Sequence, residues 1–294
     1  MTNGDFIRFT PPSFQRPGLD HIVYAQTRRS GMDPLAGNVG ETAVLFSEAN
    51  HKATQTTLSR DEWEVNEKVA VTERIRHMES AMGLSRLAML RVVHGVGIVD
   101  ATEQMEEVHY SVNYSDRPPA DIAFVTQEGD GEGVATGDCP AIVIAQPGEK
   151  FAGIVHAGFR GILGGALPTA IDTFEAMGLE RSKMVAYVGP HAHIFQLDQK
   201  ESEEARAMVA RADDDIRREF TAFTRPGINW RQPAMNMTRL AFSQLNRAGI
   251  RGDRVSVSTI NTVANGAAFS HYNAVNYGAV NGRTGVAIGI ELPN

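Results

Sequence analysis

The spacing of apolar residues along the chain predicts several helices. Between residues 66 and 82 apolar side chains recur at steps of three and four, which is the pattern of an amphipathic helix. Segments 163–177 and 236–250 show the same pattern, and Pro168 inside the first of them indicates a kink or a late helix start. Segment 199–220 is dominated by charged residues and is interpreted as a solvated helix.

Short β-branched runs with alternating apolar positions predict strands between these helices. The predicted strands are 21–26, 87–101 with a break at His94–Gly95, 141–145, 151–155, 184–190, 255–259 and 286–290. Because strands and helices alternate while hairpins are also present, we expect an α/β protein of the α+β type with a mixed β-sheet and flanking helices. Residues 1–20, rich in Pro, Gly and polar groups, are predicted to form an irregular N-terminal arm, and residues 21–294 a single large domain.

The clearest local structure is an antiparallel hairpin. Its two apolar runs, 141–145 and 151–155, flank the turn-forming pair Pro147–Gly148. A turn at this pair places Cys139 directly opposite His156, with their Cβ atoms about 4.5–5.5 Å apart. A longer loop that shifts the register by two residues would keep both side chains on the same face, whereas a shift by one would separate them.

Composition and charge remove several classes of function. The chain has 294 residues, of which 42% are hydrophobic and 21% charged, as in ordinary globular proteins. A net charge of −7 without a basic run argues against a nucleic-acid partner, and no apolar stretch approaches the roughly 18 residues that span a bilayer. With one cysteine and no secretory signal pattern at the start of the sequence, we expect a reducing, cytoplasmic setting. The oligomeric state has no signal in the sequence.

The single thiol must therefore be explained by packing, catalysis or metal binding. A thiolate beside an imidazole can act as a nucleophile with its base, so Cys139 and His156 are candidate catalytic residues, next to Asp138. The same pair can also bind a metal ion, for which His94 at another strand end is the best third ligand. Taken alone, a cysteine such as Cys139 is more often a buried structural thiol, and the residues leave these alternatives open.

Other polar residues are candidates for substrate binding. Arg28 lies where a predicted strand enters a long loop, a common place for binding residues, and Arg160 follows His156 at a strand-to-helix junction. His191 and His193 would share a face on a strand and could line the same pocket, although a loop pair without such a role is the alternative.

Several motifs together resemble the laccase-domain family, also called polyphenol oxidase-like proteins or peptidoglycan editing factors, whose members are known as purine nucleoside phosphorylases. The motifs are RVVHGVGIVDA, TGDCPAIVIA, FAGIVHAGFRGILGGAL, FSHY and NGRTGVAIGIEL, and the resemblance covers roughly residues 20–290. It implies that His94, Cys139 and His156 are zinc ligands in a catalytic domain. It also implies that Arg28, within Thr-Arg, and Asn38, in the early loop, help to hold the substrate.

Three departures from the family pattern concern the surroundings of the substrate. Where relatives usually carry Cys-Thr near the C-terminus, this chain has Asn261–Thr262, and the usual Tyr-Arg-Arg is here Tyr272–Ala274. The Gly-Pro that relatives follow with two cysteines is here Gly189–Ala192. These changes leave the implied metal ligands intact and favour a diverged substrate specificity.

The supply of metal ligands argues against a true laccase. A multicopper oxidase needs a blue-copper site and a histidine-rich trinuclear cluster, whereas this chain has nine histidines, one cysteine and a single His-x-His. One thiolate with two imidazoles suits a single zinc ion, although copper, with its higher intrinsic affinity, can occupy such a site in vitro.

The resemblance implies phosphate-dependent cleavage of a purine nucleoside, such as adenosine, inosine or methylthioadenosine, to the free base and ribose 1-phosphate. Adenosine deamination at the same site is a further implied activity. Arg28 and Arg160 would position oxyanions, and Asp138 would move protons during deamination.

Two alternatives come from other classes of protein. In the first, Cys139 is the nucleophile and His156 the base of a metal-independent hydrolase acting on amide or peptidoglycan-related substrates. In the second, the chain is a degenerate member that retains the fold and binds a partner or small ligand.

Overall fold

The strands form two large mixed sheets and one small sheet. The computed structural model describes residues 6–27, 57–103, 117–226, 233–264, 268–277, 279 and 282–293. The five-stranded sheet has the order β1 (Phe6–Arg8), β2 (Ile22–Thr27), β14 (Thr284–Ile290), β6 (Asp130–Thr136), β3 (Arg86–Met89). The six-stranded sheet has the order β13 (Val255–Val257), β9 (Val185–Val188), β7 (Ala141–Ala145), β8 (Ala152–His156), β5 (Ile122–Val125), β4 (Ile98–Asp100). The small sheet has the order β10 (Ile194–Gln196), β12 (Pro233–Asn236), β11 (Thr224–Pro226).

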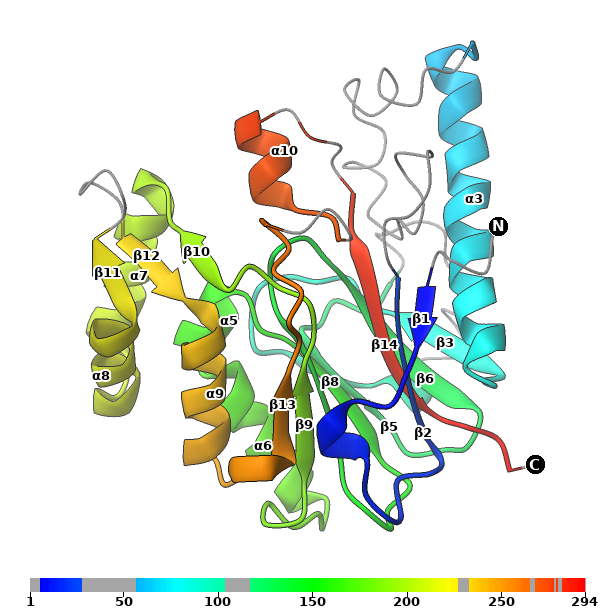
Figure 1. Ribbon diagram of the computed structural model, residues 1–294, viewed down its shortest axis with the longest axis horizontal. Helices are drawn as coiled ribbons and strands as arrows, with labels where there is room; N and C mark the ends of the chain where they lie inside the picture. Colours follow the sequence, from blue (N-terminus) through cyan, green and yellow to red (C-terminus); the bar gives the residue numbers. More distant parts are fainter. Residues whose placement is uncertain are drawn as a thin grey trace.

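Helices cover the outer faces of the two large sheets, which pack against each other through a shared core (Figure 1). Helix α3 (Arg60–Ala81) packs on the five-stranded sheet. On the six-stranded sheet lie α5 (Phe159–Leu163), α6 (Ala166–Ala176) and α9 (Met237–Arg247), with α7 (Gln199–Arg211) and α8 (Asp214–Phe223) outside them, while α10 (His271–Tyr277) stands apart. No helix within the described ranges combines the length and the apolar composition needed to cross a membrane. The predicted α/β fold with mixed sheets and flanking helices is confirmed, and its strands divide between separate sheets.

The hairpin of β7 and β8 has a longer connection than a two-residue turn. Ala141 faces His156 and Ile142 faces Val155, so the pairing is shifted by two residues from the predicted one. The prediction that Cys139 lies directly opposite His156 is therefore wrong. Because the shift is by two residues, the two side chains still lie on the same face of the sheet.

Capping residues and glycines set the helix boundaries. Helix α3 begins six residues before the predicted start, because Ser59 and Glu62 form a reciprocal capping box. The charged segment forms two helices, since the side chain of Asp213 caps the first turn of α8. The predicted helix at 163–177 is interrupted at Gly165, and α6 begins at Ala166. Pro168 lies in the first turn of α6, so the late helix start is the correct one of the two predictions for this proline.

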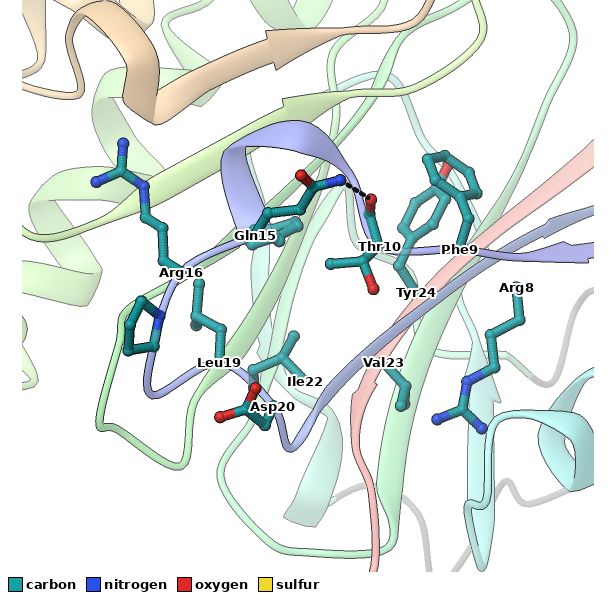
Figure 2. Close-up of a pocket in the computed structure, with 12 residues that line it drawn as sticks. Arg8, Phe9, Thr10, Gln15, Arg16, Leu19, Asp20, Ile22, Val23 and Tyr24 are labelled. Atoms are coloured by element: carbon teal, nitrogen blue, oxygen red, sulfur yellow. Dashed lines mark hydrogen bonds between the residues drawn. The ribbon is translucent and has the colours of Figure 1, made fainter.

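The N-terminal segment is integrated into the fold. From residue 6 onward the prediction of an irregular arm is wrong, because β1 pairs with β2 and a 3-10 helix follows at Pro12–Phe14. The buried hydroxyl of Ser13 donates to the carbonyl of Ala186 at 2.7 Å and so ties the segment to β9. Figure 2 shows the hollow of about 810 Å³ beside this segment, whose described lining contains no histidine or cysteine.

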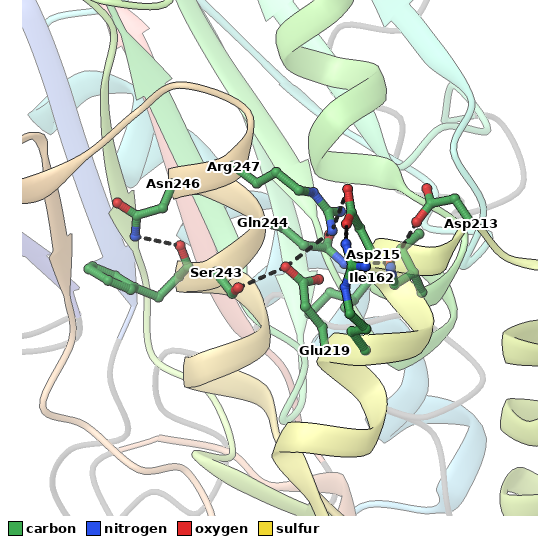
Figure 3. A network of polar contacts seen from close by, with 11 residues as sticks. Ile162, Asp213, Asp215, Glu219, Ser243, Gln244, Asn246 and Arg247 are labelled. Carbon is green, nitrogen blue, oxygen red and sulfur yellow. Dashed lines mark hydrogen bonds and ion pairs between the residues drawn. The ribbon is translucent and has the colours of Figure 1, made fainter.

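Polar contacts hold the helices on the six-stranded sheet together (Figure 3). Between α8 and α9, Glu219 accepts a hydrogen bond from Ser243 at 2.7 Å and pairs with Arg247 at 3.3 Å. The buried amide of Gln244 donates to the carbonyl of Ile162 at 3.0 Å. The last of these contacts joins α9 to α5, the short helix that begins three residues after His156.

Glu132 is a carboxylic acid within the shared core of the two sheets. It is fully buried on β6, and burial together with the nearby charge of Asp100 raises its pKa well above the usual value, although the backbone of Ile154 partly offsets this. Above pH 4.5 the unfolded chain therefore ionises at this position while the folded chain keeps its proton, so stability is lost as pH rises.

We expect Glu132→Gln to abolish this loss. As pH rises above 4.5, the free energy of unfolding of the parent protein should fall below that of the variant, by up to about 1.4 kcal/mol per pH unit. Chemical denaturation between pH 5 and 9 measures the difference, with the exposed Glu103→Gln as the control. Parallel curves for the parent and Glu132→Gln would contradict the assignment.

Candidate metal centre

Three side chains that are distant in sequence meet at one end of the six-stranded sheet. His94 lies in the loop between β3 and β4, Cys139 lies just before β7, and His156 is the last residue of β8. Their potential ligand atoms all lie within 4.8 Å of one another, with His156 buried and His94 exposed. One thiolate and two imidazoles form a donor set that could hold a metal ion and leave a coordination position open. These atoms would have to draw closer by about 1 Å to reach tetrahedral separations.

Asp121 orients two of the three candidate ligands. It lies just before β5 and is fully buried. Its Oδ1 accepts hydrogen bonds from His156 Nδ1 and from the backbone N–H of His94, both at 2.9 Å, and its Oδ2 accepts from the N–H of Gly95 at 2.6 Å. Because Nδ1 of His156 is engaged, Nε2 is the ring nitrogen left for a metal ion. The sequence analysis missed Asp121, whose only signal is an acidic residue at the start of an apolar strand.

Two residues at the site have left-handed backbone conformations. His94 has φ 61° and Asp138 has φ 87°, which side-chain-bearing residues adopt only when other contacts hold them. The bonds to Asp121 hold the His94 turn. The conformation of Asp138 places Cys139 at the entrance of β7.

The carboxylate of Asp138 is fully engaged in hydrogen bonds. Oδ1 accepts from Thr262 Oγ1 at 2.5 Å, while Oδ2 accepts from Ser270 Oγ at 3.1 Å and from the N–H of Tyr272 at 2.7 Å. A carboxylate with these three donors is a positioning group. Its predicted role in proton transfer remains a prediction that these contacts do not favour.

A glycine makes room for the thiol. A Cβ atom at Gly158 would lie 2.9 Å from Cys139 Sγ and 3.5 Å from His156 Cε1. Any side chain at this position would therefore displace the sulfur. The glycine two residues after His156 thus allows the backbone to pass close to the Cys139 thiol.

Cys139 and His156 influence each other's protonation. Burial alone would raise the pKa of Cys139, but the charge of His156 and hydrogen bonds from His156 and His94 lower it to about 6. Burial alone would lower the pKa of His156, but the Cys139 thiolate and Asp121 raise it to about 9. At neutral pH the metal-free pair is thus a thiolate and an imidazolium, and a metal ion that binds both must release the imidazolium proton.

The three side chains open into a cavity of about 280 Å³. Asp138 and Arg160, both predicted site residues, also line it. The guanidinium of Arg160 makes two 2.7 Å hydrogen bonds to Glu204 and lies 4.4 Å from the ring centroid of Phe159. The lining also includes four residues that the sequence analysis missed: Phe195, Glu201, His271 and Arg283.

Four further residues are predicted to bind substrate. Arg28 and Asn38 fall outside the described residues. His191 and His193 are absent from the described lining of the cavity, and their ring centroids lie 4.8 Å apart. His191 is buried, donates from Nδ1 to the carbonyl of Gly189 at 2.8 Å, and accepts at Nε2 from Thr238 at 2.8 Å. A substrate-binding role for this pair stays a prediction.

Two of the departures from the family pattern are neighbours in space. His191 and Asn261 form an isolated parallel β-bridge. Asn261 also accepts a hydrogen bond from the backbone N–H of His193 at 3.5 Å. Two of the positions at which the resembling family carries cysteine, 191 and 261, are therefore adjacent in this structure.

Comparison with known proteins identifies relatives of the chain. The family model described as multi-copper polyphenol oxidoreductase laccase matches residues 48–291. A purine nucleoside phosphorylase of Streptomyces coelicolor is 29% identical over 189 residues, which are 62% of this chain and 69% of that protein. Another purine nucleoside phosphorylase, from Streptomyces griseus, is 28% identical over 135 residues, covering 45% and 50% of the two chains. The crystal structure of YlmD from Geobacillus stearothermophilus matches with a TM-score of 0.71 and 17% identity over 99% of this chain and 98% of that one, which supports the fold.

We expect Asp121→Asn to weaken metal binding. The side-chain amide of asparagine has one oxygen and one NH2 group. The NH2 group would face an N–H of His94, Gly95 or His156 and could not accept its hydrogen bond, so the ring of His156 would lose its orientation. The affinity for Zn²⁺ should fall by about 10- to 100-fold. Competition with a chromophoric chelator measures this change, with the exposed Asp20→Asn as the control. Equal affinity of Asp121→Asn and the parent would contradict the role of Asp121.

We expect His191 to make the protein sensitive to mild acid. Burial lowers its pKa from 6.5 to about 4, so the unfolded chain takes up a proton in this range that the folded chain refuses. The protonation of His191 should therefore lower the free energy of unfolding of the protein by about 3 kcal/mol as pH drops from 6.5 to 4. Glutamine can keep one hydrogen-bond donor and one acceptor but does not titrate. The free energy of unfolding of His191→Gln, measured by chemical denaturation, should therefore fall less steeply across this pH range. An equally steep fall in the variant would exclude the effect.

Proposed function

The chain belongs to the family described as multi-copper polyphenol oxidoreductase laccase, and within this family we propose that it is a zinc-dependent purine nucleoside phosphorylase. The observation that carries the proposal is the convergence of His94, Cys139 and His156 on one cavity of about 280 Å³. The names of the two Streptomyces relatives support the reaction type. Adenosine, inosine and methylthioadenosine are the proposed substrates, with adenosine deamination as a second reaction in the same cavity.

The ligand set fits a single zinc ion. His94, Cys139 and His156 would hold it, and a bound zinc ion supplies a Lewis acid that polarises a substrate oxygen, a purine substituent or a water molecule. Copper can occupy the same three ligands in vitro because its intrinsic affinity is higher. The buried carboxylate of Asp121 keeps the His156 ring in a fixed orientation.

The remaining residues of the cavity divide into charged and apolar groups. The positive charges of Arg160 and Arg283 favour an anionic co-substrate such as phosphate, and Arg28 and Asn38 are proposed to complete the substrate contacts. Phe159 and Phe195 offer aromatic faces against which a purine ring can stack. Bound phosphate and nucleoside would then be held side by side, which is what phosphorolysis requires.

The partners follow from the same chemistry. We propose small molecules as partners, with no nucleic acid or membrane, because the net charge is −7 and no basic run is present. The presence of one cysteine, kept as a thiolate, favours a reducing cytoplasmic location.

A metal-independent hydrolase is the second candidate. The observation that favours it is the thiolate–imidazolium pair, since Cys139 with a pKa of about 6 and His156 with a pKa of about 9 are in the charge state of a cysteine nucleophile and its partner. A degenerate binding protein is the third, and the paired change at His191 and Asn261 favours it.

Product analysis distinguishes these candidates. We expect the zinc-loaded protein to release base and ribose 1-phosphate from adenosine, inosine or methylthioadenosine only when phosphate is present. Removal of the metal by chelation, or Cys139→Ala, should lower kcat/KM by at least about 100-fold. His94→Ala should cause a similar loss, and its matched control is His21→Ala, because His21 is absent from the described lining of the cavity. Base release that is equal without phosphate would indicate hydrolysis, and activity that survives chelation would favour the cysteine hydrolase.

A further inference from the structure

Glu201 is the carboxyl group of the cavity whose contacts leave one oxygen available. It lies in the first turn of α7 and lines the same cavity as the three candidate metal ligands. Its Oε2 accepts a hydrogen bond from the backbone N–H of Asp198 at 2.9 Å. Its Oε1 accepts no hydrogen bond within the described part of the chain, which leaves this oxygen for a molecule in the cavity.

The chain contains a second copy of this local motif, and the two differ in environment. Glu62 occupies the same capping-box position in α3, where its Oε2 accepts from the backbone N–H of Ser59 at 3.0 Å. Glu62 is exposed, and hydrogen bonds from Ser59 lower its pKa. The pKa of Glu201 is instead raised, first by burial and then by the charge of Asp198, although the hydrogen bond from Asp198 N–H and the charges of Arg160 and His271 act in the opposite direction. The wall of the cavity therefore makes Glu201 hold its proton to a higher pH than an ordinary capping glutamate.

Aromatic and apolar side chains line the cavity together with Glu201. Phe195, on the strand that leads into α7, stacks with Phe159 at a centroid distance of 6.2 Å and an interplanar angle of 18°. Met237 is a further apolar residue of the lining. A flat heterocycle that stacks on these aromatic side chains would occupy the same cavity as the Glu201 carboxyl group.

Cationic side chains also line the cavity. A Cβ at Gly137 would lie 3.2 Å from Arg283 Nη1 and 3.4 Å from His271 Cβ, so these two side chains lie over the same glycine. The cavity thus contains cationic groups that suit an anion, aromatic faces that suit a purine base, and the carboxyl group of Glu201.

We propose that Glu201 is the catalytic acid that protonates the purine base as it leaves, an inference that rests on the proposed phosphorolysis. The C1′–N9 bond breaks, its electron pair enters the imidazole ring of the purine, and the proton on Glu201 Oε1 passes to N7. An oxygen of hydrogen phosphate forms the new bond to C1′, and the proton that this phosphate loses returns to Glu201 through water. The products are the neutral base and ribose 1-phosphate.

Asp138 is the competing carboxyl group of the cavity. Both of its oxygens are engaged with Thr262, Ser270 and the N–H of Tyr272, all of which donate to it. With at least one donor on each oxygen, neither oxygen of Asp138 is left without a protein partner. Glu201 accepts one such bond and is the better donor.

A change of leaving group tests the proposal. In 7-methylinosine the base already carries a positive charge at the imidazole ring and leaves as a neutral molecule without protonation. Glu201→Gln, which keeps the capping box, should lower kcat for inosine by about 10²- to 10⁴-fold. The same variant should retain the turnover of 7-methylinosine. The matched control Glu62→Gln changes the equivalent capping residue of α3 and should leave both substrates unaffected.

Each other outcome has a distinct meaning. The proposal would be overturned if Glu201→Gln lost the same factor in kcat on both substrates, or if this variant kept full activity on inosine. Failure of the unaltered protein to release base from either nucleoside would overturn the proposed function instead. Thermal unfolding of the two glutamine variants and of Glu201→Ala shows whether folding is intact. In folded Glu201→Ala, restoration of inosine cleavage by added formate supports the proposal, while no restoration opposes it.

Discussion

The site depends on one buried carboxylate. Asp121 accepts hydrogen bonds from the turn that carries His94 and from the ring of His156, and its carbonyl accepts from the backbone N–H of His156 at 2.7 Å. A buried negative charge is costly unless it is hydrogen-bonded in this way, so each bond stabilises the others. Although burial alone would raise its pKa, these donors lower the pKa of Asp121, and it stays ionised. The two histidines are therefore placed by the fold before any metal ion binds.

A second carboxylate has the same task on the other side of the cysteine. Asp138 collects donors from segments around residues 262, 270 and 272, and so joins the C-terminal part of the chain to the start of β7. Two of the three departures from the family pattern, Asn261–Thr262 and Tyr272–Ala274, fall in these same segments. Because Thr262 and the backbone of Tyr272 still donate to Asp138, the cysteine keeps its position while Asn261 and Asn273 alter the surroundings. The division between a retained metal centre and a changed periphery has this physical basis.

The sequence predicted the fold class and the meeting of Cys139 with His156, because both follow from local periodicity and strand parity. The break of the strand at His94–Gly95 was also visible, since a glycine interrupts a β-branched run. Asp121 and Glu201 were not visible, because their roles depend on which distant groups the fold brings to them. The register of the hairpin failed by two residues, since Pro147–Gly148 forms part of a longer loop.

The two capping boxes show why a local motif does not reveal a catalytic group. Ser59 to Glu62 and Asp198 to Glu201 have the same spacing, the same reciprocal hydrogen bonds and the same position at the start of a helix. One glutamate faces solvent and the other the cavity, and the direction of the pKa shift reverses between them. The hydrogen bond at the start of the helix fixes the position of the Glu201 carboxyl group and occupies one of its oxygens. Burial by the cavity wall raises the pKa of the same group. Structural and chemical roles are thus combined in one side chain, and substitution by glutamine separates them because it retains the cap and removes the acid.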